Sequence, residues 1–123
     1  MSDELSRLPP NVQERLLRLQ QLQQTLQSIL AQKQQVEMEK TEVEQTIAEL
    51  QKTAEEAVIY KAIGSLLVKA EKPKVTEELV ERKELLDTRS TVLARQEERM
   101  RSQIKEAQTK LQEDLSPVSQ PSS

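Results

Sequence analysis

Residue types that commonly carry enzyme chemistry are scarce in this sequence. The 123 residues include no His and no Cys, which excludes the common nucleophiles and metal ligands built on these residues. The single glycine, Gly64, cannot supply a glycine-rich phosphate loop. The many Glu residues are expected to lie on solvated helix faces, where charged side chains are usually found. We therefore predict that the chain is not an enzyme and uses no metal ion or cofactor.

The composition favours long helices over an ordinary globular core. Only 35% of the residues are hydrophobic, Phe and Trp are absent, and 32% are charged. Such numbers leave two possibilities, a disordered chain or helices that bury a narrow apolar seam. Because a narrow seam leaves much of the surface in water, association with other chains is expected.

Charge and hydropathy also limit the partners and the location. The 21 acidic and 18 basic residues are mixed along the chain, so no basic block can neutralise the phosphates of a nucleic acid. No apolar run approaches the roughly 18 residues that cross a bilayer. Residues 1–10 are too acidic for a signal peptide. We expect a cytoplasmic protein without nucleic-acid or membrane partners.

The first helix is predicted over residues 11–56, after a flexible lead of residues 1–10. Asn11 is the expected N-cap, and the side chain of Glu14, three residues later, would reach back to it. The two preceding prolines are expected to keep the chain before the helix extended. Further on, apolar residues recur at spacings of four and three, which is typical of a coiled-coil seam. These residues are Leu22, Leu26, Ile29, Val36, Val43, Ile47, Leu50, Ala54 and Ala57.

Two features of this seam are irregular. Lys33 and Lys40 occupy seam positions, where they are expected to set the register of the helices or to extend toward water. Near the start of the helix, Val12, Leu16 and Leu19 follow a different register, which predicts a stammer in the first turns.

A second helix is predicted over residues 75–113. Lys72-Pro73-Lys74 is expected to form a turn before it, and Thr76–Glu78 would make an acidic first turn, which the helix dipole favours. Apolar residues four or seven apart again indicate a seam, with polar residues at the intermediate positions and a drift near Ile104 and Leu111. The apolar row is Val75, Leu79, Leu86, Leu93, Met100 and Ala107, and the polar row is Arg82, Arg89, Gln96 and Gln103.

The two stretches predict one antiparallel coiled-coil hairpin. They have similar lengths and lie on either side of a reversal, so the beginning of the first helix would meet the end of the second. Residues 114–123 contain Pro and Ser and little to bury, and they are expected to be a disordered tail.

Residues 57–71, which begin AVIYKAIGSLLVKA, predict a β-hairpin between the helices. Strand-forming residues lie on both sides of Gly64-Ser65, and glycine at the first central position is what a type II′ turn requires. Both faces of the ribbon would be largely apolar, and a lone two-stranded ribbon is marginal in water, so other subunits must complete it. The expected pairs are Ile63 with Leu66, Lys61 with Val68 and Ile59 with Ala70. The residues assigned to subunit assembly are Ile59, Tyr60, Ile63, Gly64, Leu66, Leu67 and Val68.

Two stretches give the chain a close resemblance to the β-type subunits of prefoldin. They are VIYKAIGSLLVK at residues 58–69 and the Gln-rich LQQLQQTLQSILAQKQQVE at residues 19–37, which follows an LPP opening, and the likeness covers about residues 8–115. The resemblance implies a mainly α fold whose central β-hairpin joins an oligomeric β-barrel, in a hexamer of two α-type and four β-type subunits. It also implies an ATP-independent chaperone that captures unfolded polypeptides at the coiled-coil tips and delivers them to a group II chaperonin.

Apolar residues near both ends of the chain are candidate client contacts. They crowd more than one helix face, and the predicted hairpin would bring the two ends together. Burying apolar surface contributes about 25 cal/mol per Å² whatever its shape, and several weakly binding arms gain avidity. The alternative is that these are scattered apolar residues at fraying ends. The candidates are Leu5, Leu8, Val12, Leu16, Leu17, Ile104, Leu111 and Leu115.

Two other functions fit part of the pattern. A structural coiled-coil scaffold or tether without client binding would explain the heptads equally well, but it needs no strand-forming insert with two apolar faces. An RNA-binding helical arm would need a basic face, which the mixed charge does not show.

Overall fold

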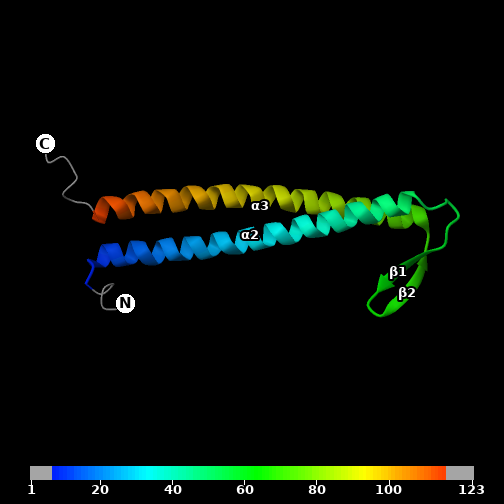
Figure 1. The fold of residues 1–123 in the computed structure, drawn as a ribbon, viewed down its shortest axis with the longest axis horizontal. Coiled ribbons are helices and arrows are strands. Elements are labelled where there is room, and N and C mark those ends of the chain that lie inside the picture. Colours follow the sequence, from blue (N-terminus) through cyan, green and yellow to red (C-terminus); the bar gives the residue numbers. More distant parts are fainter. Residues whose placement is uncertain (1–6, 116–123) are drawn as a thin grey trace. The chain divides into compact units, whose positions relative to one another are not determined.

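The computed structural model of the chain describes residues 7–115. Along the chain, two long helices flank one pair of antiparallel strands, as the sequence predicts (Figure 1). The elements are α2 (Pro10–Gln51), β1 (Ile59–Ile63), β2 (Leu66–Ala70) and α3 (Lys72–Leu115). The chain divides into two compact units. The terminal unit comprises the described residues 7–32 and 93–115, and the hairpin unit comprises residues 33–92.

Helix α2 begins one residue earlier than predicted. The carbonyl of Pro9 accepts a hydrogen bond from the amide of Val12 at 3.0 Å, so Pro9 rather than Asn11 is the N-cap residue. Pro10 then takes the first helical position, where its missing N–H is not needed and its fixed φ suits the helix. The N-cap role predicted for Asn11 is therefore wrong. Its side-chain amide donates instead to Asp114 of α3 at 3.3 Å.

Helix α2 ends at Gln51 and not at residue 56. The amide of Thr53 bonds to the carbonyl of Leu50 at 3.1 Å, which is the short i→i−3 bond of a tightened last turn. The Thr53 hydroxyl donates to the same carbonyl at 2.6 Å. The Thr53 carbonyl accepts a bond from the Lys72 ammonium group at 2.8 Å. These bonds satisfy carbonyl groups at the helix end, so the helix needs no glycine to stop.

Helix α3 begins at Lys72, so Lys72-Pro73-Lys74 is helical and not the predicted turn. The amide of Val75 donates to the carbonyl of Glu71 at 3.0 Å, which makes Glu71 the N-cap residue. The proline then lies in the first turn, where no backbone N–H has a helical partner. The predicted acidic first turn is also wrong, because Thr76–Glu78 lie in the second turn.

The seam of α3 follows the predicted apolar row but not the predicted polar row. Leu86 and Leu93 are buried, with 2% and 3% of their surface exposed, and Ser90 is half-buried between them, one residue after the predicted position. The same alternation of four and three reaches Ile104 and Leu111, which continue the seam and do not drift from it. The second row is thus Lys83, Ser90, Glu97, Ile104 and Leu111, whereas Arg82, Arg89 and Gln96 are exposed.

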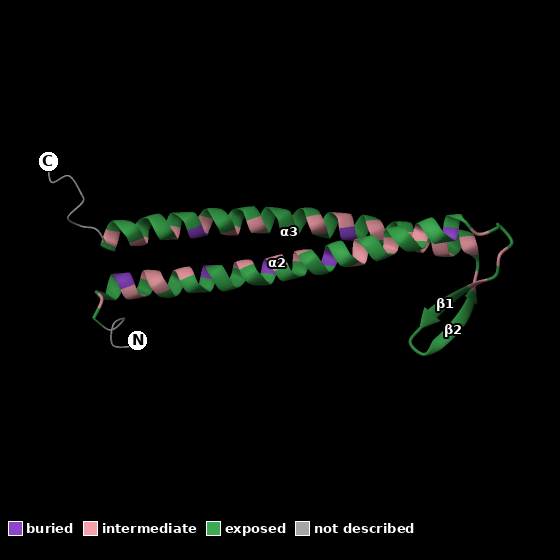
Figure 2. Cartoon of the chain, viewed as in Figure 1, coloured by how far each residue is buried: buried purple, intermediate pink, exposed green. Residues whose placement is uncertain are grey.

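The seam of α2 keeps one register. Counting back from buried Leu22 by three, four and three residues reaches Leu19, Arg15 and Val12, which are half-buried or buried. The predicted stammer is therefore wrong. The charged residue Arg15 occupies the seam position that was assigned to Leu16, and this hid the register. The buried residues of α2 are Val12, Leu22, Ile29, Val36 and Leu50 (Figure 2).

The β-hairpin has the predicted register and the predicted turn. Ile63 pairs with Leu66, Lys61 with Val68 and Ile59 with Ala70. Gly64 has a φ of 60°, whereas Ser65, like the other non-glycine residues of the described chain, has a negative φ. A positive φ at the first central position alone distinguishes type II′ from type I′, which needs it at both positions.

Candidate functional surfaces

The hairpin formed by β1 and β2 exposes large apolar side chains on both faces. Tyr60 and Leu67, which share one face, have 61% and 72% of their surface exposed. On the other face Ile63 and Leu66 have 53% and 66% of their surface exposed, and Val68 is also exposed. Residues 59–70 include no buried residue (Figure 2). The ribbon therefore has apolar surface without a cover inside its own unit.

Two polar contacts tie this hairpin to the helices of its unit. The Lys61 ammonium group of β1 lies 2.7 Å from a carboxylate oxygen of Glu78 in α3. The hydrogen bond from Lys61 is the main cause that lowers the pKa of Glu78, and the charges of Lys61 and Lys74 act in the same direction. The bond from Lys72 to the carbonyl of Thr53 joins the start of α3 to the end of α2. These contacts fix where the strands leave the helix pair.

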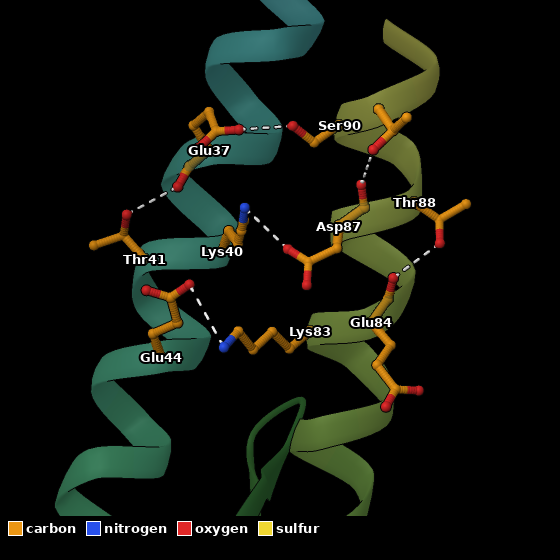
Figure 3. Close-up of polar contacts among 10 residues, drawn as sticks. Glu37, Lys40, Thr41, Glu44, Lys83, Glu84, Asp87, Thr88 and Ser90 are labelled. Atoms are coloured by element: carbon orange, nitrogen blue, oxygen red, sulfur yellow. Dashed lines mark hydrogen bonds and ion pairs between the residues drawn. The ribbon is translucent and has the colours of Figure 1, made fainter. Parts of the chain in front are cut away.

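Further along the hairpin unit, a set of polar contacts, here called the polar ladder, bridges α2 and α3. Lys40 lies 2.9 Å from Asp87, the Ser90 hydroxyl donates to Glu37 at 2.9 Å, and Lys83 lies 4.0 Å from Glu44 (Figure 3). Each contact joins a seam position of one helix to a residue beside the seam of the other. A one-turn shift of either helix would break all three together.

Lys40 shows how a cation is tolerated in the seam. The hydrogen bond to Asp87 and the Asp87 charge raise the pKa of Lys40 above its ordinary value of 10.5, and Glu37 and Glu44 add to this effect. The role of Lys40 in setting the register stays a prediction, and the pairing with Asp87 is the contact through which Lys40 would act. Lys33, the other predicted seam lysine, is half-buried.

The terminal unit brings the described candidate client residues of both helices together, but it does not expose all of them. Val12 and Ile104 are buried at 2% and 8% exposure, so the expectation that they form an open apolar surface fails. Both residues belong to the seam between the helices. The predicted heptad register was wrong around them, so they were counted as exposed. Leu17 and Leu115 are 60% and 52% exposed. Leu8, Leu16 and Leu111 are half-buried, and Leu5 lies outside the described residues.

An open groove also runs between the helices of the terminal unit. Its lining includes the cations Arg15, Arg18 and Lys110 and the anions Glu14 and Glu106. Arg15 already makes a close ion pair with Asp114. Because both signs of charge line the groove, it does not form a selective site for an anion or a cation.

The long-range polar contacts were not predicted from the sequence. Arg15 with Asp114, Lys61 with Glu78 and the ladder pairs join residues far apart in the chain. A signal for the ladder was present, since the antiparallel pairing of two known heptads places each seam lysine opposite a small set of residues. The predicted polar row of α3 was one residue out of register, and this removed the signal.

The fold and these surfaces define a class of protein, an antiparallel coiled-coil hairpin whose β-hairpin is left incomplete by its own chain. A family model described as "Prefoldin subunit" matches residues 13–117. The chain therefore belongs to the prefoldin family, whose members are chaperone subunits rather than enzymes.

Individual relatives agree with this assignment. The chain is 47% identical over 113 residues to prefoldin subunit beta of Archaeoglobus fulgidus, covering 92% of this chain and 97% of that protein. It is 44% identical over 108 residues to prefoldin subunit beta of Methanothrix thermoacetophila, covering 88% and 90%. The crystal structure of the prefoldin beta subunit from Thermococcus strain KS-1 matches with a TM-score of 0.79 at 36% identity, covering 94% and 97%. Among residues 7–115, no helix has the length and hydropathy to cross a membrane.

Proposed function

We propose that the chain is the β-type subunit of a cytoplasmic prefoldin hexamer that holds unfolded polypeptides without ATP and delivers them to a group II chaperonin. Two α-type and four β-type subunits would form this hexamer. The observation that carries the proposal is the exposed apolar β-hairpin in a chain of the prefoldin family. A tether without client binding would not need this hairpin.

Assembly through the hairpin has a clear physical basis. Transfer of one large apolar side chain from water into an interface contributes about 1.5–3 kcal/mol. Tyr60, Leu66 and Leu67 are each more than half exposed, so contact with other hairpins would remove a large apolar area from water. The strand pair also has two outer edges, which strands of other subunits would complete into a β-barrel.

Client capture is assigned to the terminal unit. Leu17 on α2 and Leu115 on α3 keep more than half of their surface in water. An unfolded chain exposes apolar groups without a fixed shape, and such groups can be held by scattered apolar contacts that each bind weakly. Leu8, Leu16 and Leu111 would add contact area as half-buried neighbours.

The test of capture compares two pairs of exposed apolar residues. The chain is assembled with an α-type prefoldin subunit and mixed with a denatured protein while light scattering records aggregation. Replacing Leu17 and Leu115 by Gln is expected to weaken suppression of aggregation without changing the mass of the complex. The matched control replaces Leu85 and Val92 by Gln, since these α3 residues are also exposed but lie in the hairpin unit. Equal suppression by both variants would refute the assignment of capture to the terminal unit.

The test of assembly uses the hairpin. Ile63→Asp combined with Val68→Asp places two charges on one face of the ribbon and should leave helical chains that no longer form the hexamer in native mass measurement. Circular dichroism controls for retained helix. A hexamer of unchanged mass would contradict the proposed barrel.

A further inference from the structure

One stretch of α2 in the terminal unit differs from all other helical surface in its chemistry. Residues 19–32, LQQLQQTLQSILAQ, contain no charged side chain. The α3 segment of the same unit, residues 93–115, carries charges throughout its length. Solubility explains the charges on α3, but it does not explain why the neighbouring helix meets the same requirement with uncharged polar side chains alone, most of them Gln.

The outer side of this stretch forms a stripe of exposed amides. Gln20, Gln24 and Gln27 follow Leu17 at steps of three, four and three, which places them on one face of the helix. All three are exposed, and their side chains make no hydrogen bond to another residue of the described chain. We call Gln20, Gln24 and Gln27 the amide stripe. It begins beside Leu17, which has 60% of its surface exposed.

The hydrogen-bonding groups of this stripe match those of a peptide main chain. A Gln amide offers two donors and a carbonyl acceptor, and each residue of a main chain offers an N–H donor and a carbonyl acceptor. An unfolded polypeptide presents these groups whatever its sequence. Because no charge lies in residues 19–32, a peptide can approach the stripe without desolvating an ionised group, which would oppose binding.

We infer that the amide stripe binds the main chain of an extended, unfolded polypeptide whose apolar side chains contact Leu17. This inference rests on the proposed holdase function and adds the chemistry of recognition. Apolar contacts hold the client by its side chains, and the amides hold it by a feature that every sequence shares. Clients of either net charge are then accepted, because the stripe neither attracts nor repels them.

The first experiment places charges on the stripe. The variant Q20E/Q24E/Q27E keeps the size and helix propensity of each residue but replaces amides by carboxylates. In the complex with the α-type subunit, its affinity for a fluorescein-labelled, unfolded peptide of Ala, Ser, Gly and Leu should fall about tenfold, as the loss of one or two net hydrogen bonds predicts. The control Q96E/Q108E/Q112E makes the same changes at exposed positions of α3 in the same unit and should leave the affinity unchanged. Equal affinities for the two variants would overturn the inference.

A second experiment tests the main-chain contact directly. The same peptide is made with N-methyl groups on alternate backbone nitrogens, which removes donors without adding charge. N-methylation should weaken binding to the unchanged complex several-fold, but it should have little further effect on Q20M/Q24M/Q27M, in which the amides are gone. If N-methylation weakens binding to both complexes by the same factor, the stripe does not contact the main chain.

These results separate the inference from the function on which it rests. If the unchanged complex fails to bind the peptide and to suppress aggregation, the proposed holdase function is wrong. If the unchanged complex binds and the stripe variants bind equally well, the holdase function stands and the amide stripe is ordinary solvated surface.

Discussion

The terminal unit and the hairpin unit use the same two helices but specify their pairing differently. In the hairpin unit, contacts such as Lys40 with Asp87 and Lys83 with Glu44 cross between the helices at defined positions. In the terminal unit the ion pair of Arg15 with Asp114 crosses near the start of α2 and the end of α3. The rest of the described seam contains buried Val12, Leu22, Ile29, Leu93 and Ile104, and residues 19–32 of α2 carry no charge. Polar pairs discriminate between registers, whereas apolar residues in a heptad tolerate a shift more easily. We therefore expect the register to be fixed most strictly in the hairpin unit, where several polar pairs cross between the helices.

The largest expected effect comes from truncating a buried side chain of the seam in either unit. Leu86→Ala in the hairpin unit and Leu22→Ala in the terminal unit each remove a nearly buried side chain and should destabilise the affected unit by about 2–3 kcal/mol. Hydrogen exchange should report faster opening mainly in the unit that carries the substitution.

The control for this prediction is the residue next to Leu86. Leu85 has 58% of its surface exposed, so Leu85→Ala should change exchange little. If L86A and L85A exchange alike, the seam assigned to α3 is wrong. If L22A and L86A both accelerate exchange throughout the chain, the two units open as one and the comparison between them fails.

A smaller effect is expected at Gly64, whose positive φ constrains which residues the turn of the hairpin accepts. Gly64 has a φ of 60°, and open space surrounds the position of an added Cβ atom, so a substitution is opposed by the backbone alone. Gly64→Val should destabilise the hairpin by about 1–2 kcal/mol. The measurement is amide exchange in β1 and β2, with Ser65→Ala as control because Ser65 has a negative φ. Equal exchange in the two variants would contradict the type II′ turn.

The register and the turn of the hairpin were predicted correctly because their signals are local. One glycine, two flanking runs of strand formers and a fixed turn length determine which residue faces which, and no distant contact is needed. The helix ends were predicted less well for the opposite reason. Lys72-Pro73-Lys74 resembles a turn, yet a proline is compatible with the first helical turn once Glu71 serves as N-cap.

The seam of α3 shows the limit of hydrophobic periodicity. The row that contains Leu86 and Leu93 was found because apolar residues contrast with their neighbours. The second row passes through Lys83, Ser90 and Glu97, which are as polar as the residues beside them, so periodicity could not place it. Only the partner helix distinguishes these positions. The same error led Ile104 to be counted among exposed candidates for client binding, although it is buried.

The polar ladder should contribute little to stability and more to register. Lys40 and Asp87 are partly exposed, so Asp87→Ala should destabilise the hairpin unit only slightly, and much less than Leu86→Ala. Replacing both residues by Leu should keep or raise stability but weaken the choice of register. Because the chain has no Cys, spin labels can be attached at Thr41→Cys and Thr88→Cys, and the distance between them measured. A distribution as narrow in the Leu pair as in the original would show that the ladder does not set the register.

The smallest expected effect concerns pH, and it should appear in the hairpin unit at both extremes. The lowered pKa of Glu78 means that its pairing with Lys61 contributes stability above the ordinary value of 4.5 and loses it as the pH falls through the folded value. The raised pKa of Lys40 means that its pairing with Asp87 contributes below 10.5 and loses stability as the pH rises through the folded value.

Acidification from neutral pH should therefore loosen the attachment of β1 to α3. The measurement is the protection of amides around Lys61 against exchange, relative to the intrinsic exchange rate at each pH, and this protection should fall. Glu78→Gln should remove this pH dependence, and Glu77→Gln, which changes the exposed neighbour, should preserve it. Both pairs are open to water, so screening keeps the change small and added salt should reduce it further. If the acid response is the same in E78Q and E77Q, the contact between Lys61 and Glu78 does not hold the hairpin, and the attachment must depend on the bond from Lys72 to the Thr53 carbonyl, which has no acidic partner to titrate.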